Sequence, residues 1–295
     1  MSAISPPWLD RKLWPYPVRF TDTGDGPQAW YKAGSGPAVV LVHGTPTWSL
    51  EWRHVIADLA ADHRVIAVDH LGFGQSAKPK GAGYMPEDHA RRFDALMQRA
   101  LPDGSATLVL HDFGGPFALP WVLANWHRVS RLVLVNSFGW TLADDPAASS
   151  AVTFVNGAIG RFLYLSLHAE VRWLLKAAWA RGSRLTPEVH AHYLNVHVTR
   201  DERQILFALA RSFTESREWF EGLANRLPEL ANTPTDLIWG MGDRLVGPTV
   251  LAHWRQTLPH AHVAEIADAG HWPHEEQPDA FIAALRNALD APRSS

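Results

Sequence analysis

The 295-residue sequence contains no cysteine, which excludes disulfide bonds, thiolate catalysis and cysteine-ligated metals. It has no run of 18 apolar residues and no basic segment leading into an apolar stretch before Trp8, so we expect neither a membrane span nor a signal peptide. A net charge of −3 argues against nucleic acid as a partner. No Gly-x-Ser-x-Gly motif occurs, which argues against an ordinary serine esterase. By default we expect a cytoplasmic protein.

Apolar residues make up 46% of the chain and charged residues 19%, as in globular proteins with a large core. The length fits one large domain or one domain with an insertion. The proline-rich stretch 6–17 has no period and is expected to lie extended on the surface, and residues 292–295 are expected to fray.

Apolar runs alternate with amphipathic helical patterns along most of the chain, which implies right-handed crossovers between parallel strands. A turn signal at 22–27 predicts that the first two strands form an antiparallel hairpin. The predicted strands are Val18–Thr21, Gln28–Ala33, Ala38–Val42, Arg64–Val68, Thr107–His111, Leu132–Val135, Thr235–Trp239 and Val263–Ile266. The alternation stops at Asn136, and residues 137–230 show helical patterns only. We therefore expect a core formed by residues 1–136 and 231–295, with residues 137–230 inserted as a helical cap.

One central stretch combines an apolar strand, a single carboxylate and two glycines. Thr107–His111 is the strand, and Asp112 is expected at the tip of a sharp turn. Only small residues can follow such a turn, as Gly114 and Gly115 do, and Pro116 then opens a helix. This is the geometry of a nucleophile elbow with Asp where Ser is usual. The same pattern also fits a carboxylate that merely caps a helix, so both interpretations stay open at this point.

Polar side chains stand where several predicted strands end, and ligands bind beyond the carboxyl ends of an open parallel sheet. These residues are His43, Asp69, Asp112, Asn136, Asp243 and His271. The order Asp112, Asp243, His271 matches the nucleophile, acid and base of a known hydrolase triad. Each residue alone is more often structural, but three at the right strand ends together indicate a catalytic site.

The chain resembles haloalkane dehalogenases and close relatives in the α/β-hydrolase superfamily nearly from end to end. The similar motifs are Pro7–Arg11, His43–Ser49, His111–Gly115, Trp239–Asp243 and Asp268–His271. The resemblance implies an α/β-hydrolase fold, in which a mostly parallel eight-stranded sheet is flanked by helices and a helical cap follows the sixth strand. It also implies that Asp112 is the nucleophile and His271 the base. Asp243 is the implied acid, because the alternative position after the sixth strand holds Asn136.

The resemblance further implies that the chain hydrolyses carbon–halogen bonds in small apolar substrates with water, without a cofactor or metal. A carboxylate nucleophile can displace a leaving group from a saturated carbon and form an alkyl ester. His271, oriented by Asp243, would then take a proton from the water that hydrolyses the ester. The backbone N–H groups of Thr45 and Phe113 are placed to stabilise the oxyanion.

Two positions depart from the dehalogenase pattern. These enzymes usually bind the departing halide with an indole after the nucleophile, where this chain has Phe113, and many use Asn or Glu at the position of Thr45. Losing two such hydrogen bonds without replacement would slow the step by roughly 10² to 10⁴. Candidates for the halide or substrate pocket are Thr45, Phe113, Trp140, Tyr164, Trp173, Trp179, Tyr193 and Trp272.

Other interpretations remain open. Epoxide hydrolases share the Asp nucleophile and protonate the opening oxygen with cap tyrosines, for which Tyr164 and Tyr193 are candidates, and lactones or esters are related substrates. A binding module with a vestigial triad is the alternative from another class. His190, His192 and His197 match no metal-ligand spacing, so no metal site is expected. The sequence fits a monomer or a small homo-oligomer.

Overall fold

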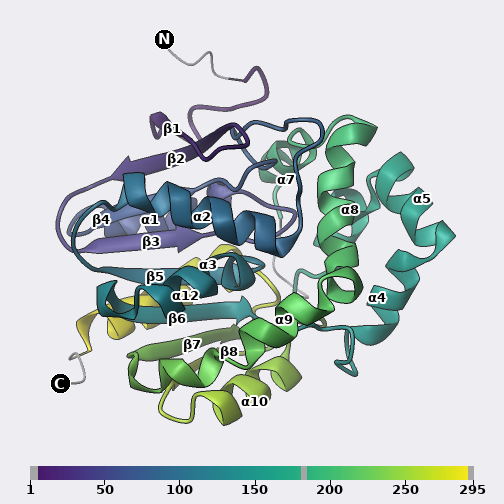
Figure 1. Ribbon diagram of the computed structural model, residues 1–295. Coiled ribbons are helices and arrows are strands. Elements are labelled where there is room, and N and C mark those ends of the chain that lie inside the picture. Colours follow the sequence, from purple (N-terminus) through teal and green to yellow (C-terminus); the bar gives the residue numbers. More distant parts are fainter. Residues whose placement is uncertain (1–5, 181–184, 292–295) are drawn as a thin grey trace.

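The computed structural model of the protein describes residues 6–180 and 185–291 and contains one eight-stranded sheet (Figure 1). Its strands are β1 (Val18–Asp22), β2 (Pro27–Ala33), β3 (Ala38–Val42), β4 (Arg64–Val68), β5 (Ala106–Asp112), β6 (Val129–Ser137), β7 (Thr235–Gly240) and β8 (His262–Ile266). They follow the order β1-β2-β4-β3-β5-β6-β7-β8, in which β2 is antiparallel to β1 and β4 and all other neighbours are parallel. The expected α/β fold with a mostly parallel sheet is confirmed.

The central strands of the sheet are continuous apolar runs because they are buried on both faces. Every residue of β3 and of β5 is buried, because helices cover both faces of the sheet there. β5 lies between β3 and β6, and Leu108 pairs in parallel with Val40 on one side and Leu132 on the other. The carboxyl ends of these strands therefore reach the same edge of the sheet, and Asp112 is the last residue of β5.

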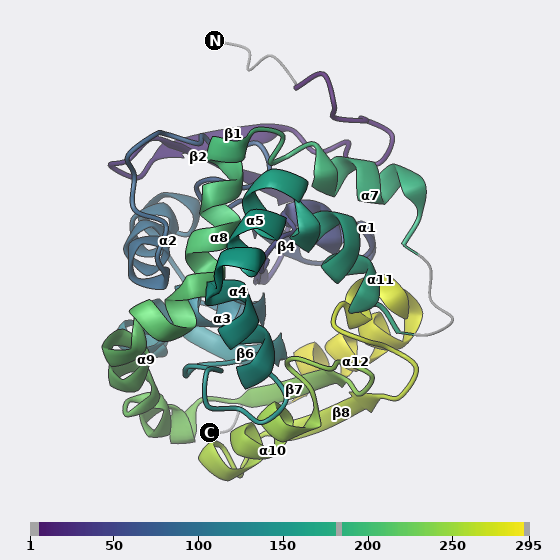
Figure 2. The same cartoon turned by 90° about the vertical axis from the view of Figure 1, so that its right-hand side faces the viewer.

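Helices form a layer on each face of the sheet. Figure 2 shows α2 and α3 on one face and α1, α11 and α12 on the other. The core helices are η1 (Ser49–Trp52), α1 (Arg53–Leu59), α2 (Pro86–Ala100), α3 (Gly114–Ala124), η2 (Trp126–Arg128), α10 (Pro248–Thr257), α11 (Pro273–Glu276) and α12 (Pro278–Asp290). The helix expected to open at Pro116 is α3, which ends at Ala124 and is followed by the 3₁₀ turn η2. Within the described residues, no helix is long and apolar enough to cross a membrane.

The chain between β6 and β7 forms the expected helical cap, which lies over the carboxyl ends of the strands (Figure 1). Its elements are α4 (Ser149–Asn156), α5 (Ala158–Leu167), the π-helical turn η3 (Glu170–Leu174), α6 (Leu175–Ala177), α7 (Pro187–Leu194), α8 (Arg200–Glu215), α9 (Arg217–Ala224) and η4 (Leu227–Asn232). Between Ser137 and Thr235, the described part of the chain contains no strand. The division into units 1–136, 137–230 and 231–295 stays a prediction.

The N-terminal segment from residue 6 to 17 is irregular, yet it does more than lie on the surface. Trp14 is fully buried and meets the rings of Tyr31 and Trp48 edge to face at 4.8 and 5.2 Å. The backbone N–H of Asp10 donates to Nε2 of His192 on α7 at 2.9 Å. This segment therefore links the core to the cap. The fraying expected at 292–295 falls outside the described residues.

Candidate active site

Asp112 occupies a strained turn at the end of β5. Its φ of 50° is left-handed, which is rare for a residue other than glycine and is seen where a turn holds a functional side chain. Ser137 Oγ donates to the Asp112 carbonyl at 2.6 Å. A Cβ on Gly114 would lie 2.5 Å from the carbonyl oxygen of Val42, so only glycine fits at the start of α3. The capping alternative is not what the structure shows, because Phe113 holds the N-cap position of α3 and the Asp112 carboxylate contacts other groups.

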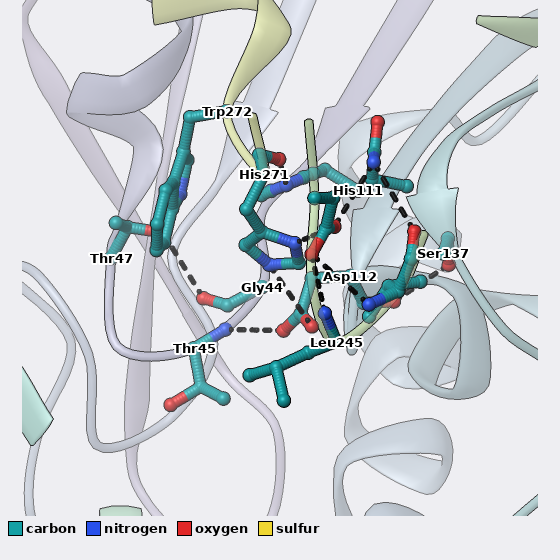
Figure 3. Close-up of polar contacts among 12 residues, drawn as sticks. Gly44, Thr45, Thr47, His111, Asp112, Ser137, Leu245, His271 and Trp272 are labelled. Atoms are coloured by element: carbon teal, nitrogen blue, oxygen red, sulfur yellow. Dashed lines mark hydrogen bonds and ion pairs between the residues drawn. The ribbon is translucent and has the colours of Figure 1, made fainter. Parts of the chain in front are cut away.

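The structure brings Asp112, His271 and Asp243 together, as Figure 3 shows for the first two. His271 Nε2 lies 3.4 Å from Asp112 Oδ2, and His271 Nδ1 lies 2.5 Å from Asp243 Oδ2. The second oxygen of Asp243 accepts from the N–H groups of Leu245 and Val246 at 2.9 and 3.1 Å. Asp243 follows β7 and His271 follows β8, so the parallel sheet alone delivers both to the end of β5.

The charges of this triad support one another. Burial alone would lower the pKa of His271, but the carboxylates of Asp243 and Asp112 outweigh it and raise this pKa well above its ordinary value. Burial would raise the pKa of Asp243, but the charge and hydrogen bond of His271, with two backbone N–H groups, leave it lowered. The imidazolium form of His271 is therefore stabilised between two carboxylates in the free protein.

Asn136 supports the acid instead of replacing it. Its backbone is also left-handed, with φ at 36°, and its side-chain N–H₂ donates to Asp243 Oδ2 at 3.0 Å. Its side-chain oxygen accepts from the N–H of Gly240 at 2.8 Å. Asn136 thus joins the ends of β6 and β7 and donates to the same Asp243 oxygen that His271 Nδ1 contacts.

The loop after β3 approaches the nucleophile from the opposite side. The Thr45 N–H donates to Asp112 Oδ1 at 3.0 Å (Figure 3). A Cβ on Gly44 would lie 2.4 Å from the same oxygen, so the loop can come this close only with glycine there. His43 shapes the loop: Nε2 accepts from the N–H of His70 at 3.0 Å, so Nδ1 carries the proton and donates to the Gly44 carbonyl at 2.7 Å. Burial lowers the pKa of His43 to about 3, which keeps it neutral.

Asp69 does not join the cluster. Its carboxylate accepts from the N–H groups of Ser49 and Gln75 at 3.0 and 2.9 Å and from the Tyr31 hydroxyl at 2.7 Å. It therefore braces the loops after β3 and β4.

A cavity of about 150 Å³ lies between the triad and the cap and is mostly apolar. Four of the eight pocket candidates line it beside Asp112 and His271, namely Thr45, Phe113, Tyr164 and Trp272. The other four are not among its lining residues. Trp140 stacks on His253 at 3.9 Å, and Trp173 is 52% exposed. Trp179 stacks on Trp272 at 4.9 Å, and the Tyr193 hydroxyl donates to Glu275 at 2.9 Å.

Sequence reasoning missed Glu170, which also lines the cavity. It opens the π-helical turn η3 and accepts from the Thr45 hydroxyl at 3.2 Å through Oε1. Burial, together with the charge of Asp112, raises the pKa of Glu170 to about 8 against the effect of the Thr45 hydrogen bond. Glu170 is the one acidic residue between Asp145 and Glu188, and this was the available indication in the sequence, but it does not reveal which way the side chain points.

Within the described residues, Glu51, His111 and His274 form a buried group whose ligand atoms could surround a metal ion. His111 Nε2 donates to the carbonyl of His271 at 2.8 Å, and Nδ1 faces Glu51 at 3.1 Å. In this arrangement the group holds the backbone of His271 in place. The three cap histidines lie apart and bond backbone groups: His190 bonds Val171, His192 bonds Asp10 and His197 bonds Gly72.

The chain is similar in sequence and in fold to known proteins. A model of the α/β-hydrolase fold matches residues 37–278. Haloalkane dehalogenase 2 from Mycobacterium tuberculosis is 30% identical over 278 residues, which cover 94% of this chain and 96% of the relative. Cis-3-alkyl-4-alkyloxetan-2-one decarboxylase from Shewanella oneidensis is 27% identical over 284 residues, covering 94% and 89%.

A solved structure is similar as well. The crystal structure of haloalkane dehalogenase DbeA from Bradyrhizobium elkani has a TM-score of 0.80 and 27% identity over 92% of this chain and 99% of that one. With the sheet order, the cap after β6 and the family match over most of the residues, the comparisons lead to one assignment. The chain belongs to the α/β-hydrolase family and is a haloalkane dehalogenase-like hydrolase.

Proposed function

We propose that this hydrolase breaks the bond between a saturated carbon and a leaving group through a covalent ester on Asp112, with carbon–halogen bonds of small apolar compounds as the first substrate class. The observation that carries the proposal is the position of the Asp112 carboxylate, between the Thr45 N–H and His271 Nε2 in a mostly apolar cavity. Its oxygen attacks the carbon, and the halide leaves with the electron pair of the broken bond. Relatives named as haloalkane dehalogenases support this class.

Formation of the ester prepares its own hydrolysis. Esterification removes the charge of Asp112, which is one of the two carboxylates that raise the pKa of His271. The imidazolium then loses its proton more readily, and the neutral imidazole accepts a proton from the water that attacks the ester carbonyl. Asp243 orients the ring through Nδ1. We assign the oxyanion to the N–H of Thr45, 3.0 Å from Asp112 Oδ1, with the N–H of Phe113 as the second donor.

The second candidate reaction is the opening of a strained ring. It is favoured because the Phe113 ring offers a leaving halide no hydrogen bond and the Thr45 hydroxyl already donates to Glu170. A relative named for an oxetanone substrate supports this class. The unbroken contacts from Asp112 through His271 to Asp243 favour an enzyme over a binding module with a vestigial triad.

The test traps the ester. His271→Phe leaves the attacking carboxylate in place but removes the base, so incubation with 1-bromohexane should add one hexyl group that persists in the intact-protein mass spectrum. Peptide mapping should place it on Asp112, and Asp112→Ala in the same background should remove it. Absence of an adduct with bromoalkanes, epoxides and lactones alike would contradict the covalent mechanism.

A further inference from the structure

We propose that the Glu170 carboxyl is a catalytic acid that gives its proton to an oxygen leaving group, so that the site accepts strained cyclic ethers, of which an epoxide is the simplest. The proposal rests on the proposed function, because the Asp112 ester must form for the ring to open. It deepens that function by naming the residue that handles the leaving group and the substrate class that this residue requires.

The position of Glu170 is the first argument. Its side chain comes from the cap, while Asp112 comes from the sheet, and both line the same cavity. Thr45 joins the two: its hydroxyl donates to Glu170 Oε1 at 3.2 Å and its backbone N–H donates to Asp112 Oδ1 at 3.0 Å. One residue, Thr45, therefore contacts both the acid and the nucleophile on the wall of one cavity.

The protonation state of Glu170 is the second argument. The residue is 8% exposed, and its Oε2 has no hydrogen-bond partner within the described residues. The titratable groups that face it are Asp112 from β5, Tyr164 from α5 and His271 from the loop after β8. Burial and the negative charge of Asp112 together raise the pKa of Glu170 to about 8, so its carboxyl is neutral at pH 7 and can donate a proton.

The chemistry of the leaving group decides the substrate class. A halide departs as a stable anion and needs no proton, whereas a ring oxygen departs as an alkoxide unless an acid protonates it. When Asp112 attacks a ring carbon, the carbon–oxygen bond breaks, its electron pair goes to oxygen, and the Glu170 proton converts that oxygen to a hydroxyl. Water then adds to the ester, and its proton passes through His271 to the released alcohol. The Asp112 carboxyl so formed loses a proton, and Glu170 regains one.

The usual tyrosine pair does not account for ring opening here. Tyr164 lines the cavity, but the Tyr193 hydroxyl donates to Glu275 outside it. Burial, followed by the neighbouring Glu170, raises the pKa of Tyr164 well above its ordinary value, which makes its hydroxyl the weaker acid of the two. Glu170 is therefore the acidic proton donor on the cap side of the cavity within the described residues.

The experiment compares two electrophiles with the same alkyl chain, 1,2-epoxyhexane and 1-bromohexane, in the His271→Phe background. The rate of adduct formation is followed by intact-protein mass spectrometry. Glu170→Gln keeps the shape of the side chain but has no acidic proton, so the ratio of epoxide rate to bromide rate should fall by about 100-fold. Glu188→Gln, which changes an exposed cap carboxylate on α7, should leave this ratio unchanged.

The pH profile gives a readout that a merely structural role would not move. With Glu170 present, the epoxide rate should fall about tenfold per pH unit above about 8, as the carboxyl ionises, and this decline should be absent in Glu170→Gln. An equal loss of both rates, or an unchanged ratio, would overturn the acid role. Bromide adducts without epoxide adducts would overturn the inference and leave the proposed function standing. Absence of every adduct would overturn both.

Discussion

Two buried carboxylates on opposite sides of the cavity have pKa values shifted in opposite directions. The core wall of the cavity includes Thr45, Asp112, Phe113 and His271, and the cap wall includes Tyr164 and Glu170. Behind the core wall, Asp243 receives one contact from the lining residue His271 and hydrogen bonds from two backbone N–H groups and Asn136, and its pKa is lowered. On the cap wall, Glu170 receives one hydroxyl hydrogen bond and its pKa is raised to about 8. Burial acts on both in the same direction, so the difference comes from the partners.

This contrast separates two tasks. On the core side, the charged triad residues lie at the ends of strands, and they carry out the attack on carbon and the hydrolysis of the ester. The cap wall is apolar apart from a neutral acid and a tyrosine, so it suits the leaving group and the substrate. Substitutions of the triad residues should stop turnover, whereas substitutions on the cap wall should alter which bond of the substrate is broken.

The largest effect is expected from the core wall. Asp243→Asn should slow ester hydrolysis by roughly 10³ to 10⁴, because the amide neither stabilises the imidazolium nor holds the correct tautomer. It should also lower the pKa of His271, since Asp243 is the leading cause of its rise. The ester should accumulate in burst kinetics, and the imidazole can be titrated by NMR. Asp268→Asn, an exposed change in the motif that contains His271, is the control. If Asp243→Asn turned over substrate within threefold of the parent rate, the charge on the core side would not be needed for ester hydrolysis, and the contrast between the two walls would fail.

A smaller effect should appear in the stability of the cap wall. Glu170 has a pKa of about 8 when folded against 4.5 as its reference value, so between these values the native state holds a proton that the unfolded state has lost. Its contribution is present below about pH 4.5 and is lost as pH rises toward 8. Relative to the parent protein, Glu170→Gln should therefore gain on the order of 4 kcal/mol in unfolding free energy as the pH rises from 4.5 to 8.

Urea unfolding at pH 4.5, 6 and 8 measures this change, with Glu188→Gln as the exposed match. The unfolding free energies of the two glutamine variants should diverge as the pH rises. If they stayed parallel, Glu170 would be ionised in the native state and the contrast between the walls would disappear.

The smallest effect should come from adding a hydrogen-bond donor for a bound halide. Phe113 lines the cavity directly after the nucleophile and packs against Phe138 and Phe213 at 5.0 and 5.2 Å. Phe113→Trp supplies an indole N–H, and a hydrogen bond to an ion is worth about 1.5–3 kcal/mol, part of which the crowding of these rings offsets. Bromide affinity should rise about tenfold, measured as saturable quenching of tryptophan fluorescence. Phe154→Trp, at an exposed position of α4, should add no saturable phase. Equal quenching in both variants would contradict the expectation.

The sequence by itself determined the fold and the edge of the sheet at which the three triad residues meet. Apolar runs of strand length alternating with helices predicted the sheet, and the structure confirms it. Because parallel strands carry their carboxyl ends to one edge, Asp112, Asp243 and His271 could be grouped without knowing their distances. Two glycines after Asp112 were enough to predict the sharp turn.

Only the tertiary structure decided which cap residues face the cavity. The hydrophobic pattern of a short cap helix does not reveal its neighbours, so Tyr164 and Tyr193 were indistinguishable until packing placed one in the cavity and one on Glu275. Glu170 meets Thr45 across 125 residues of sequence, and the Asn136 amide meets Asp243 across 107. Such contacts depend on how whole elements pack, and no local periodicity encodes them.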